Sequence, residues 1–284
     1  DPHSPSCRIL SPLPCRIPAD WLVMYSRGFA SRPDAAEALF AFLGAGMAWR
    51  VEHGADALTT TPPPRRAEFE RVWHGGIIGS DEYGHPVVLE KFCHVSPKEL
   101  LAVTPTDELF LLQQIYNQEA CREYITAQNM RTRRRIYKHI TVFDLEGLSF
   151  AHADRKLVSL VRMLNTHFAF TYPDTVRKII VINAPAAFTM VWNLIKSFLH
   201  PVTVEKVSVL GKNYAAALAA EKIQLTPEYL AGEMPSWSAE LKRLHAEWDP
   251  AALQPGFALP EVRHRAVPSS TPPPPSCPCD PVIP

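Results

Sequence analysis

The alternation of apolar and polar residues between Tyr172 and Gly211 predicts a strand, a helix and a second strand in close succession. Residues Ile179–Ile182 form a short β-branched apolar run, typical of a parallel strand covered on both faces. Apolar residues then recur at helical spacing from Ala187 to Leu199, around most of the helix circumference. Such a helix is about 20 Å long, too short to cross a bilayer core of about 30 Å. It is therefore either a core helix or a movable wall over an apolar cavity.

The rest of the chain repeats this alternation of strands and helices. A second buried strand is expected at His139–Leu145, and the spacing of apolar residues predicts an amphipathic helix over Ala153–Phe170. Upstream, the Gly84-His85-Pro86 turn leads into a strand ending near Glu90. The segment Thr104-Pro105-Thr106-Asp107 then provides a cap for a helix that reaches about Asn129. Shorter helices are expected at Ala35–Leu43, Arg65–Trp73, Tyr214–Lys222 and Glu240–Trp248. This order predicts an α/β fold with a mainly parallel sheet and right-handed crossovers.

Composition and charge exclude several classes of protein. The 284 residues are 46% hydrophobic and carry no formal net charge, so a sizeable core is expected and general attraction to nucleic acid is not. The six cysteines include no CxxC pair, which argues against a zinc site or a disulfide scaffold. Residues 1–19 lack the pattern of a secretory signal. We expect no nucleic-acid partner and no metal.

Motifs of catalytic chemistry are missing as well. The sequence contains no GxSxG elbow, Walker loop, HExxH pair or strand-linked GxGxxG. Asp144 and Glu146 follow a predicted strand, where catalytic carboxylates can lie, but an acidic pair that caps the next element is more common. We therefore expect a binding protein without a cofactor, and not an enzyme.

A basic run at Arg131–Arg135, with Lys138 close by, follows the long helix. Its simplest interpretation is a solvated helix end, where cations offset the negative end of the helix dipole. Two alternatives are a patch that attracts anionic lipids and a signal for nuclear import or RNA binding.

The sequence around the first segment resembles a known family. Tyr172-Pro173-Asp174, Val181-Ile182-Asn183-Ala184-Pro185 and Pro201-Val202-Thr203-Val204 with Lys206 resemble the core of the Sec14-like (CRAL-TRIO) lipid-binding domain, without gaps. The resemblance implies a sheet flanked by helices, of which the apolar one is a mobile gate. It also implies a small, partial helical domain upstream. The expected divisions are a disordered tail (1–19), this helical domain (20–60), the lipid-binding domain (66–233), a short helical extension (234–250) and a disordered proline-rich tail (251–284).

The resemblance also implies a ligand. Acyl chains need a dry cavity, whereas a phosphate headgroup needs hydroxyl donors and a cation. Asp174, Thr203 and Lys206 stand where family members place residues that bind phosphatidylinositol. Thr141 and Tyr172 match the hydroxyl residues of members that also take phosphatidylcholine, while His139 replaces a serine and Tyr25 replaces a headgroup arginine. The expected cavity and gate residues are Phe188, Val191, Trp192, Ile195, Phe198, Ile180, Ile182 and Val142.

The implied mechanism is lipid exchange without covalent catalysis. The helix over Ala187–Leu199 would close over the lipid in solution and open at a bilayer. We expect a cytosolic monomer with transient membrane contact, Golgi or endosomal membranes being the candidates. Two alternatives stay open: a lipid-sensing scaffold that recruits partners through its proline-rich tail, and a carrier of a tocopherol, retinoid, sterol or haem.

Overall fold

A computed structural model describes residues 19–27, 34–91, 94–148, 155–185, 188–197, 199, 201–226, 228–229, 233 and 236–247. The helices of this part are α2 (Ala19–Arg27), α3 (Ala35–Glu52), η1 (Ala55–Ala57), α4 (Arg66–Val72), α5 (Pro97–Val103), α6 (Asp107–Thr132), α7 (Arg155–Thr171), α8 (Phe188–Lys196), α9 (Pro201–Glu205), α10 (Ala215–Ala220) and α12 (Trp237–Glu247). The strands are β1 (Gly75–Ser80), β2 (Pro86–Glu90), β3 (His139–Asp144), β4 (Val176–Ile182) and β5 (Val207–Val209). None of the described helices is long and apolar enough to cross a membrane.

The five strands form one sheet in the order β1-β2-β3-β4-β5. The first pair is an antiparallel hairpin, and the other three pairs are parallel. Each parallel neighbour is reached through helices, as the predicted alternation requires. The expected α/β class with a mainly parallel sheet is confirmed.

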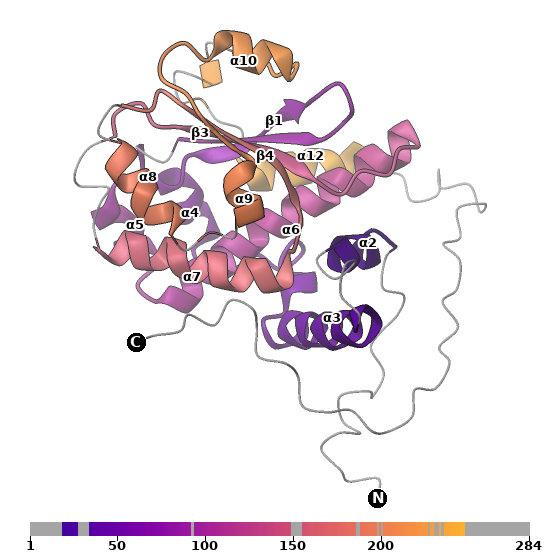
Figure 1. The fold of residues 1–284 in the computed structure, drawn as a ribbon. Helices are drawn as coiled ribbons and strands as arrows, with labels where there is room; N and C mark the ends of the chain where they lie inside the picture. The colour runs from indigo at the N-terminus through magenta and orange to yellow at the C-terminus, as the bar shows by residue number, and fades with distance from the viewer. Residues whose placement is uncertain are drawn as a thin grey trace, which may run out of the picture.

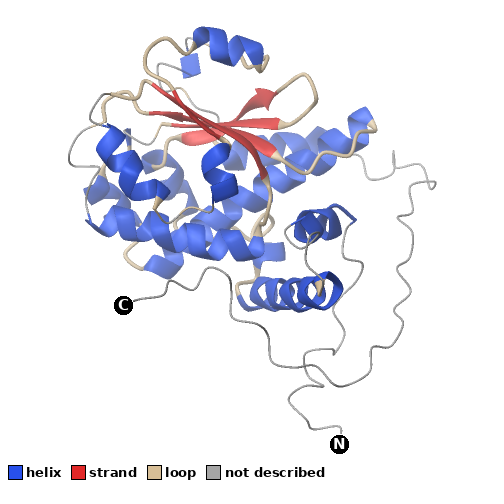
Figure 2. Ribbon diagram, viewed as in Figure 1, coloured by secondary structure: helices blue, strands red, loops and turns tan. Residues whose placement is uncertain are grey.

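Helices cover the two faces of the sheet unequally. Figures 1 and 2 show α10 and a short helical piece above one face, and the thicker layer that contains α4 to α9 below the other. Strand alternation divides the apolar side chains between these faces. Ile140 and Ile180 pack in one cluster with Leu218 of α10, while Val181 packs in another with Phe188 of α8. The helical layer is therefore the side on which α8 meets the sheet.

The two N-terminal helices are joined to the main body through buried contacts. The Tyr25 hydroxyl of α2 donates to the Thr171 carbonyl at the end of α7, at 3.1 Å. A Cβ added at Gly46 of α3 would lie 2.4 Å from that hydroxyl oxygen, so only glycine fits there. Trp49 of α3 belongs to the same apolar cluster as Ile115 and Tyr116 of α6.

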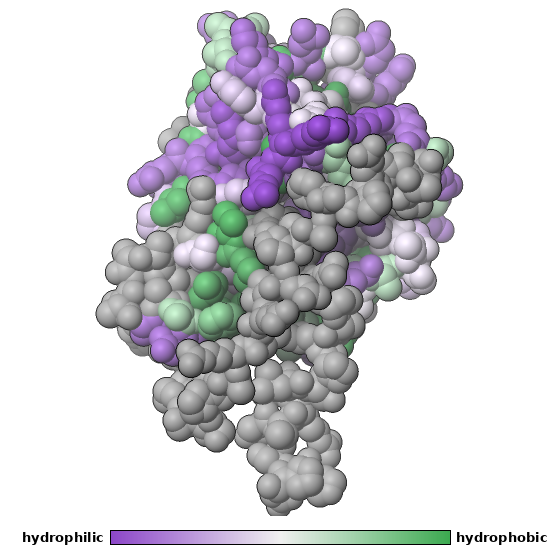
Figure 3. Space-filling model, turned by 90° about the vertical axis from the view of Figure 1, so that its right-hand side faces the viewer, coloured by the Kyte–Doolittle hydropathy of each residue, from purple (hydrophilic) through white to green (hydrophobic). Residues whose placement is uncertain are grey.

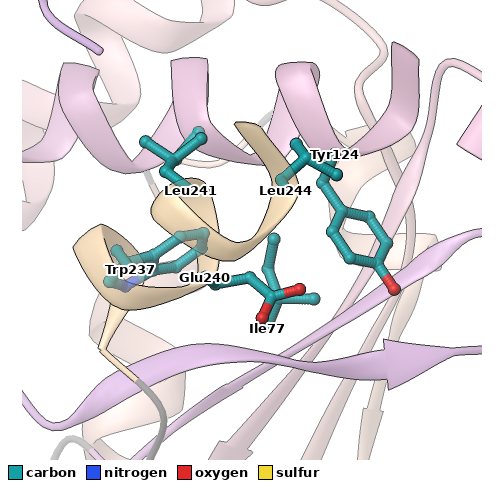
Figure 4. A pocket seen from close by; sticks show the side chains of 7 residues that line it. Ile77, Tyr124, Trp237, Glu240, Leu241 and Leu244 are labelled. Atoms are coloured by element: carbon teal, nitrogen blue, oxygen red, sulfur yellow. The ribbon is translucent and has the colours of Figure 1, made fainter. Parts of the chain in front are cut away.

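Helix α12 is wedged between α6 and β1. Figure 4 shows Trp237, Leu241 and Leu244 of α12 between α6 and β1, where they line one small pocket together with Tyr124 of α6 and Ile77 of β1. These side chains are buried in the cluster that also holds the N-terminal Trp49. The helix predicted near the C-terminal end thus packs on the body of the fold.

One segment differs from its prediction. Residues Pro201–Glu205 form the short helix α9, where the sequence predicts the start of a strand. The strand β5 begins only at Val207 and pairs with Ile179 to Val181 of β4. Proline at the first helical position suits a helix start, because its missing N–H has no partner there in any helix.

Candidate functional site

Two lysines and one aspartate meet where β3 and β4 begin. Asp174 precedes β4, and its Oδ1 lies 2.7 Å from Lys138 Nζ and 3.0 Å from Lys206 Nζ. The Tyr137 hydroxyl donates to Oδ2 of the same carboxylate at 3.3 Å. All three charged side chains are mostly buried. The structure thus joins the predicted pair Asp174 and Lys206, and adds a second cation.

Electrostatics at this cluster favour the charged carboxylate. Burial raises the pKa of Asp174, but the hydrogen bonds from Lys138 and Lys206 outweigh burial and hold that pKa below its ordinary value. The backbone of Asp174 has a φ of 55°, a left-handed conformation that aspartate tolerates better than most residues. The resulting turn brings its side chain toward the starts of β3 and β5.

Lys138 is the residue of this cluster that sequence reasoning missed. In the sequence, Lys138 stands close to the basic run that follows α6 and is grouped with it. Lys138 stands immediately before the strand His139–Asp144, and Asp174 stands shortly before the parallel neighbouring strand. Neighbouring parallel strands start at the same edge of a sheet, so these two positions are the signal that could have identified Lys138.

His139 and Thr141 lie on β3 next to this cluster. Both are buried, and strand alternation places them on the same sheet face as Phe143, which packs in the cluster of α8. Burial, with a smaller contribution from the charge of Lys206, lowers the pKa of His139 to about 4. The imidazole is therefore neutral at physiological pH. It presents no additional positive charge to a ligand.

Thr203 lies on α9, one turn before Lys206. Its carbonyl accepts a hydrogen bond from the Lys206 N–H at 3.1 Å, so the backbones of these two residues are adjacent. The Thr203 side chain is half-buried. The distance between Thr203 and Lys206 is therefore set by one turn of the short helix α9, and not by a strand.

Tyr172 lies elsewhere, in a buried network with the N-terminal helices. Its hydroxyl donates to Glu119 Oε1 at 2.5 Å and accepts from Arg50 at 3.4 Å. Arg50 in turn donates to both oxygens of Glu119, at 2.7 and 2.9 Å. The Tyr172 hydroxyl is thus held by Glu119 and Arg50. The structure does not bring this hydroxyl to the Asp174 cluster.

The predicted gate residues that the structure describes differ in burial. Phe188 is buried against β4 and stacks on Trp192 with ring centroids 6.4 Å apart, whereas Trp192 and Ile195 are half-buried. Leu194 is 46% exposed. The side chain of Val191 and the whole of Phe198 lie outside the described part of the chain. Helix α8 thus combines an apolar inner face with apolar residues open to solvent.

The predicted sheet residues of the cavity lie on the opposite face from α8. Val142, Ile180 and Ile182 are fully buried in the cluster that includes Leu218 of α10. The sheet residues packed with α8 are Phe143, Ile179, Val181 and Val207. A cavity beneath α8 would be lined by this second set, because alternate residues of a strand point to opposite faces.

A hollow of about 330 Å³ lies between α8 and the end of β5. Its lining includes Phe188 and Trp192 of α8 together with Val209 and Leu210. This volume is near the lower limit for pockets that hold small molecules. A lipid with two acyl chains needs more room than α8 leaves in this position.

The strand-end acid Asp144 has a structural role. It is buried, and its Oδ1 accepts hydrogen bonds from the Glu146 N–H at 3.0 Å and from the Asn183 side chain at 2.8 Å. Lys91, also buried, has its ammonium 3.7 Å from Oδ2. The carboxylate caps the turn after β3, in line with the structural interpretation of this acidic pair.

Comparison with known proteins gives the same fold family. The CRAL/TRIO domain model matches residues 70–229, more than half of the chain. The chain belongs to the CRAL/TRIO family. Its matched region contains the whole sheet and α8, and its Sec14-like relatives agree with the resemblance seen in the sequence.

Several curated relatives are about 30% identical. The phosphatidylinositol/phosphatidylcholine transfer protein SFH9 of Arabidopsis thaliana is 30% identical over 66% of this chain and 32% of its own length. The SEC14 cytosolic factor of Eremothecium gossypii and the Sec14 cytosolic factor of Schizosaccharomyces pombe are each 30% identical over 60% of this chain. The chain spans 55% and 59% of those two proteins. A solved structure, "Crystal structure of Sfh5", aligns with a TM-score of 0.49 and 20% identity, over 60% of this chain and 59% of that one.

Proposed function

We propose that this protein binds a phospholipid, phosphatidylinositol in the first place and phosphatidylcholine as a second ligand, and carries or presents it between membranes. The observation that carries the proposal is the Asp174 cluster, where Lys206 and Lys138 flank one carboxylate at the starts of β3 and β4. Ammonium groups suit a phosphate, and a carboxylate accepts hydrogen bonds from inositol hydroxyls. The names of the relatives, which are phosphatidylinositol/phosphatidylcholine transfer proteins, support the same ligand class.

The proposed mechanism is physical exchange, without covalent catalysis and without a cofactor. In the lipid-loaded protein α8 would lie farther from the sheet than it does in this structure, and would cover the acyl chains over Phe143, Val181 and Val207. At a bilayer, Trp192, Leu194 and Ile195 find an apolar environment in the membrane, so the open position of α8 becomes accessible there. We propose that the protein is cytosolic, that it is a monomer in solution, and that it contacts the membrane surface transiently.

A transfer assay with a locked gate tests this mechanism. Trp192 on α8 and Val209 on β5 line one hollow. With Trp192→Cys and Val209→Cys, the two thiols would each add to one end of a bis-maleimide whose linker contains a disulfide, which ties α8 to β5 until the linker is reduced. The background would carry serine at Cys7, Cys15, Cys93, Cys277 and Cys279. Cys121 can stay, because burial raises the pKa of its thiol to about 12 and leaves it unreactive.

The readout is movement of labelled phosphatidylinositol from donor to acceptor vesicles. Crosslinking should stop transfer, and reductive cleavage of the same sample should restore it, which makes the cleaved sample the matched control. Transfer at an unchanged rate in the crosslinked state would rule out α8 as a gate. Binding of phosphatidylinositol without any transfer by the unmodified protein would favour the lipid-sensing alternative.

A further inference from the structure

Helix α3 has an exposed face with almost no polar side chains. Phe40, Gly44, Ala48 and Val51 follow one another at spacings of three and four residues and therefore share one side of the helix. Phe40 is 61% exposed and Val51 is 69% exposed. The neighbouring Ala41 and Ala45 are also exposed. An amphipathic surface helix normally presents charged residues on this side, so the face is suited to a partner.

The charged residues of α3 lie away from the middle of this face. Glu37 and Glu52 are exposed near the two ends, and Arg50 is buried on the other side against Glu119. Between the two glutamates, four turns of helix present only apolar or small residues. Helix α2 packs against α3 and adds Val23, which is 42% exposed. Figure 3 looks at the side of the molecule that carries α2 and α3, and shows hydrophobic surface at mid-height below a hydrophilic band.

Exposed arginines border these helices. Tyr137 packs in the apolar cluster that Met24 and Tyr25 of α2 form with Leu43 of α3. The basic run ends at Arg135, two residues before Tyr137, so the end of the run lies next to the two helices. Arg133 and Arg135 of this run are exposed, while Arg134 donates to the Glu82 carbonyl and Arg131 pairs with Glu247. The surface combines an apolar helix face with positive charge at its border.

We propose that the exposed face of α3, together with Arg133 and Arg135, docks on an anionic bilayer. A helix that lies in the interface buries its apolar face among the acyl chains and gains further from cations near anionic headgroups. The glutamates at the ends of α3 stay at headgroup level. Docking here also brings the membrane to the side of the molecule that holds the Asp174 cluster, because Tyr137 packs on α2 and α3 and donates to Asp174. The inference rests on the proposed function only in taking a bilayer as the partner.

Flotation with vesicles tests the docking directly, using the full chain. The vesicles would contain phosphatidylcholine alone or phosphatidylcholine with about a third phosphatidylserine. The protein should float with the anionic vesicles and detach in high salt, because salt screens the arginine contribution. Phe40→Glu with Val51→Glu should lower the bound fraction about tenfold, and Arg133→Glu with Arg135→Glu should do the same. Phe40→Trp should retain binding, since tryptophan favours the interface.

Matched controls separate docking from general effects. Lys212→Glu with Lys222→Glu changes the charge equally, at exposed positions near α10, and should float like the wild type. Circular dichroism should show equal melting for all variants, because every substituted side chain is exposed.

Three results would overturn the proposal. These are wild-type protein that does not float, α3 variants that float normally, and a wild-type dimer in solution that Phe40→Glu converts to monomers while flotation persists. The last result would assign the face to a second copy of the chain. Flotation needs no lipid exchange, so normal docking with no lipid transfer would count against the proposed function and leave this inference intact.

Discussion

The Lys206 ammonium lies 3.0 Å from the Asp174 carboxylate, although the two residues stand at opposite ends of the segment that contains β4, α8 and α9. Their contact closes that segment into a loop whose two ends meet at the start of the sheet. Lys138 joins the same carboxylate oxygen from the preceding strand. Asp174 thus holds together the starts of three neighbouring strands, β3, β4 and β5.

We expect Asp174→Asn to destabilise the protein by about 1–3 kcal/mol, between the values for exposed and fully buried ion pairs. Asparagine also tolerates the left-handed backbone at this position, so the change tests charge and not conformation. Because the pKa of Asp174 is depressed in the folded state, its contribution is present above the unfolded pKa of about 3.9 and is lost as pH falls through the folded pKa.

Urea unfolding of wild type and Asp174→Asn between pH 3 and pH 7 measures this difference. Asp107→Asn breaks an exposed pair with Lys156 and serves as the control, with an expected cost below about 1 kcal/mol. Equal costs for the two substitutions at pH 7 would argue against a central role of Asp174.

His139 should make the fold sensitive to mild acid. Its pKa is about 4 in the folded protein and about 6.5 when unfolded, so the unfolded state binds more protons between these values. Stability should therefore fall as pH is lowered through this window, by about 3 kcal/mol in total. His139→Gln removes the titrating group. The difference between wild type and this variant, measured by urea unfolding from pH 7 to pH 4, should follow that curve, and a flat difference would contradict it.

Two glycines of α3 should respond in opposite directions to the same substitution. Gly46→Ala places a methyl group 2.4 Å from the Tyr25 hydroxyl oxygen and should destabilise by about 1–3 kcal/mol. No atom lies within 4 Å of a Cβ at Gly44, so Gly44→Ala should stabilise by about 0.5–1 kcal/mol through helix propensity. Thermal unfolding followed by circular dichroism measures both. A stabilising Gly46→Ala would mean that α2 and α3 pack differently.

The buried pair of Arg50 and Glu119 should hold α3 on the body of the protein. Glu119→Gln removes the charge of the bidentate partner of the buried Arg50 guanidinium, which keeps its ion pair with the exposed Asp56, so we expect a cost of about 3 kcal/mol at pH 7. Glu108→Gln, at an exposed position of the same helix α6, should cost less than about 1 kcal/mol. Chemical unfolding of both variants tests this, and similar midpoints would show that the Arg50 contact contributes little.

The sequence predicted the fold better than the site, for physical reasons. Strands at Ile179–Ile182 and His139–Leu145 follow from local apolar runs. The cap expected within Thr104-Pro105-Thr106-Asp107 is Thr106, whose hydroxyl accepts from the Leu109 N–H at 3.2 Å. The sequence does not show which strand residues face α8 and which face α10. In a run such as Ile179–Ile182 the residues on both faces are apolar, so the pattern cannot distinguish the two faces.

Side-chain contacts between residues far apart in the chain could not be predicted from the local sequence pattern either. The Tyr172 hydroxyl meets Glu119, 53 residues away, and Lys138 meets Asp174, 36 residues away. Neither contact leaves a spacing pattern in the sequence. The helix α9 was missed because Val202-Thr203-Val204 is β-branched, and tertiary packing overrides that propensity here.

The most direct test of the lipid-binding account is mass spectrometry of the lipids that co-purify with the protein from a eukaryotic host. Wild type would be compared with Thr203→Ala/Lys206→Ala, and with Thr126→Ala/Lys212→Ala as a control at exposed positions. The account predicts phosphatidylinositol in the wild type and the control, and its loss from the Thr203/Lys206 variant. An empty wild type, or the same neutral apolar molecule in all three proteins, would contradict it.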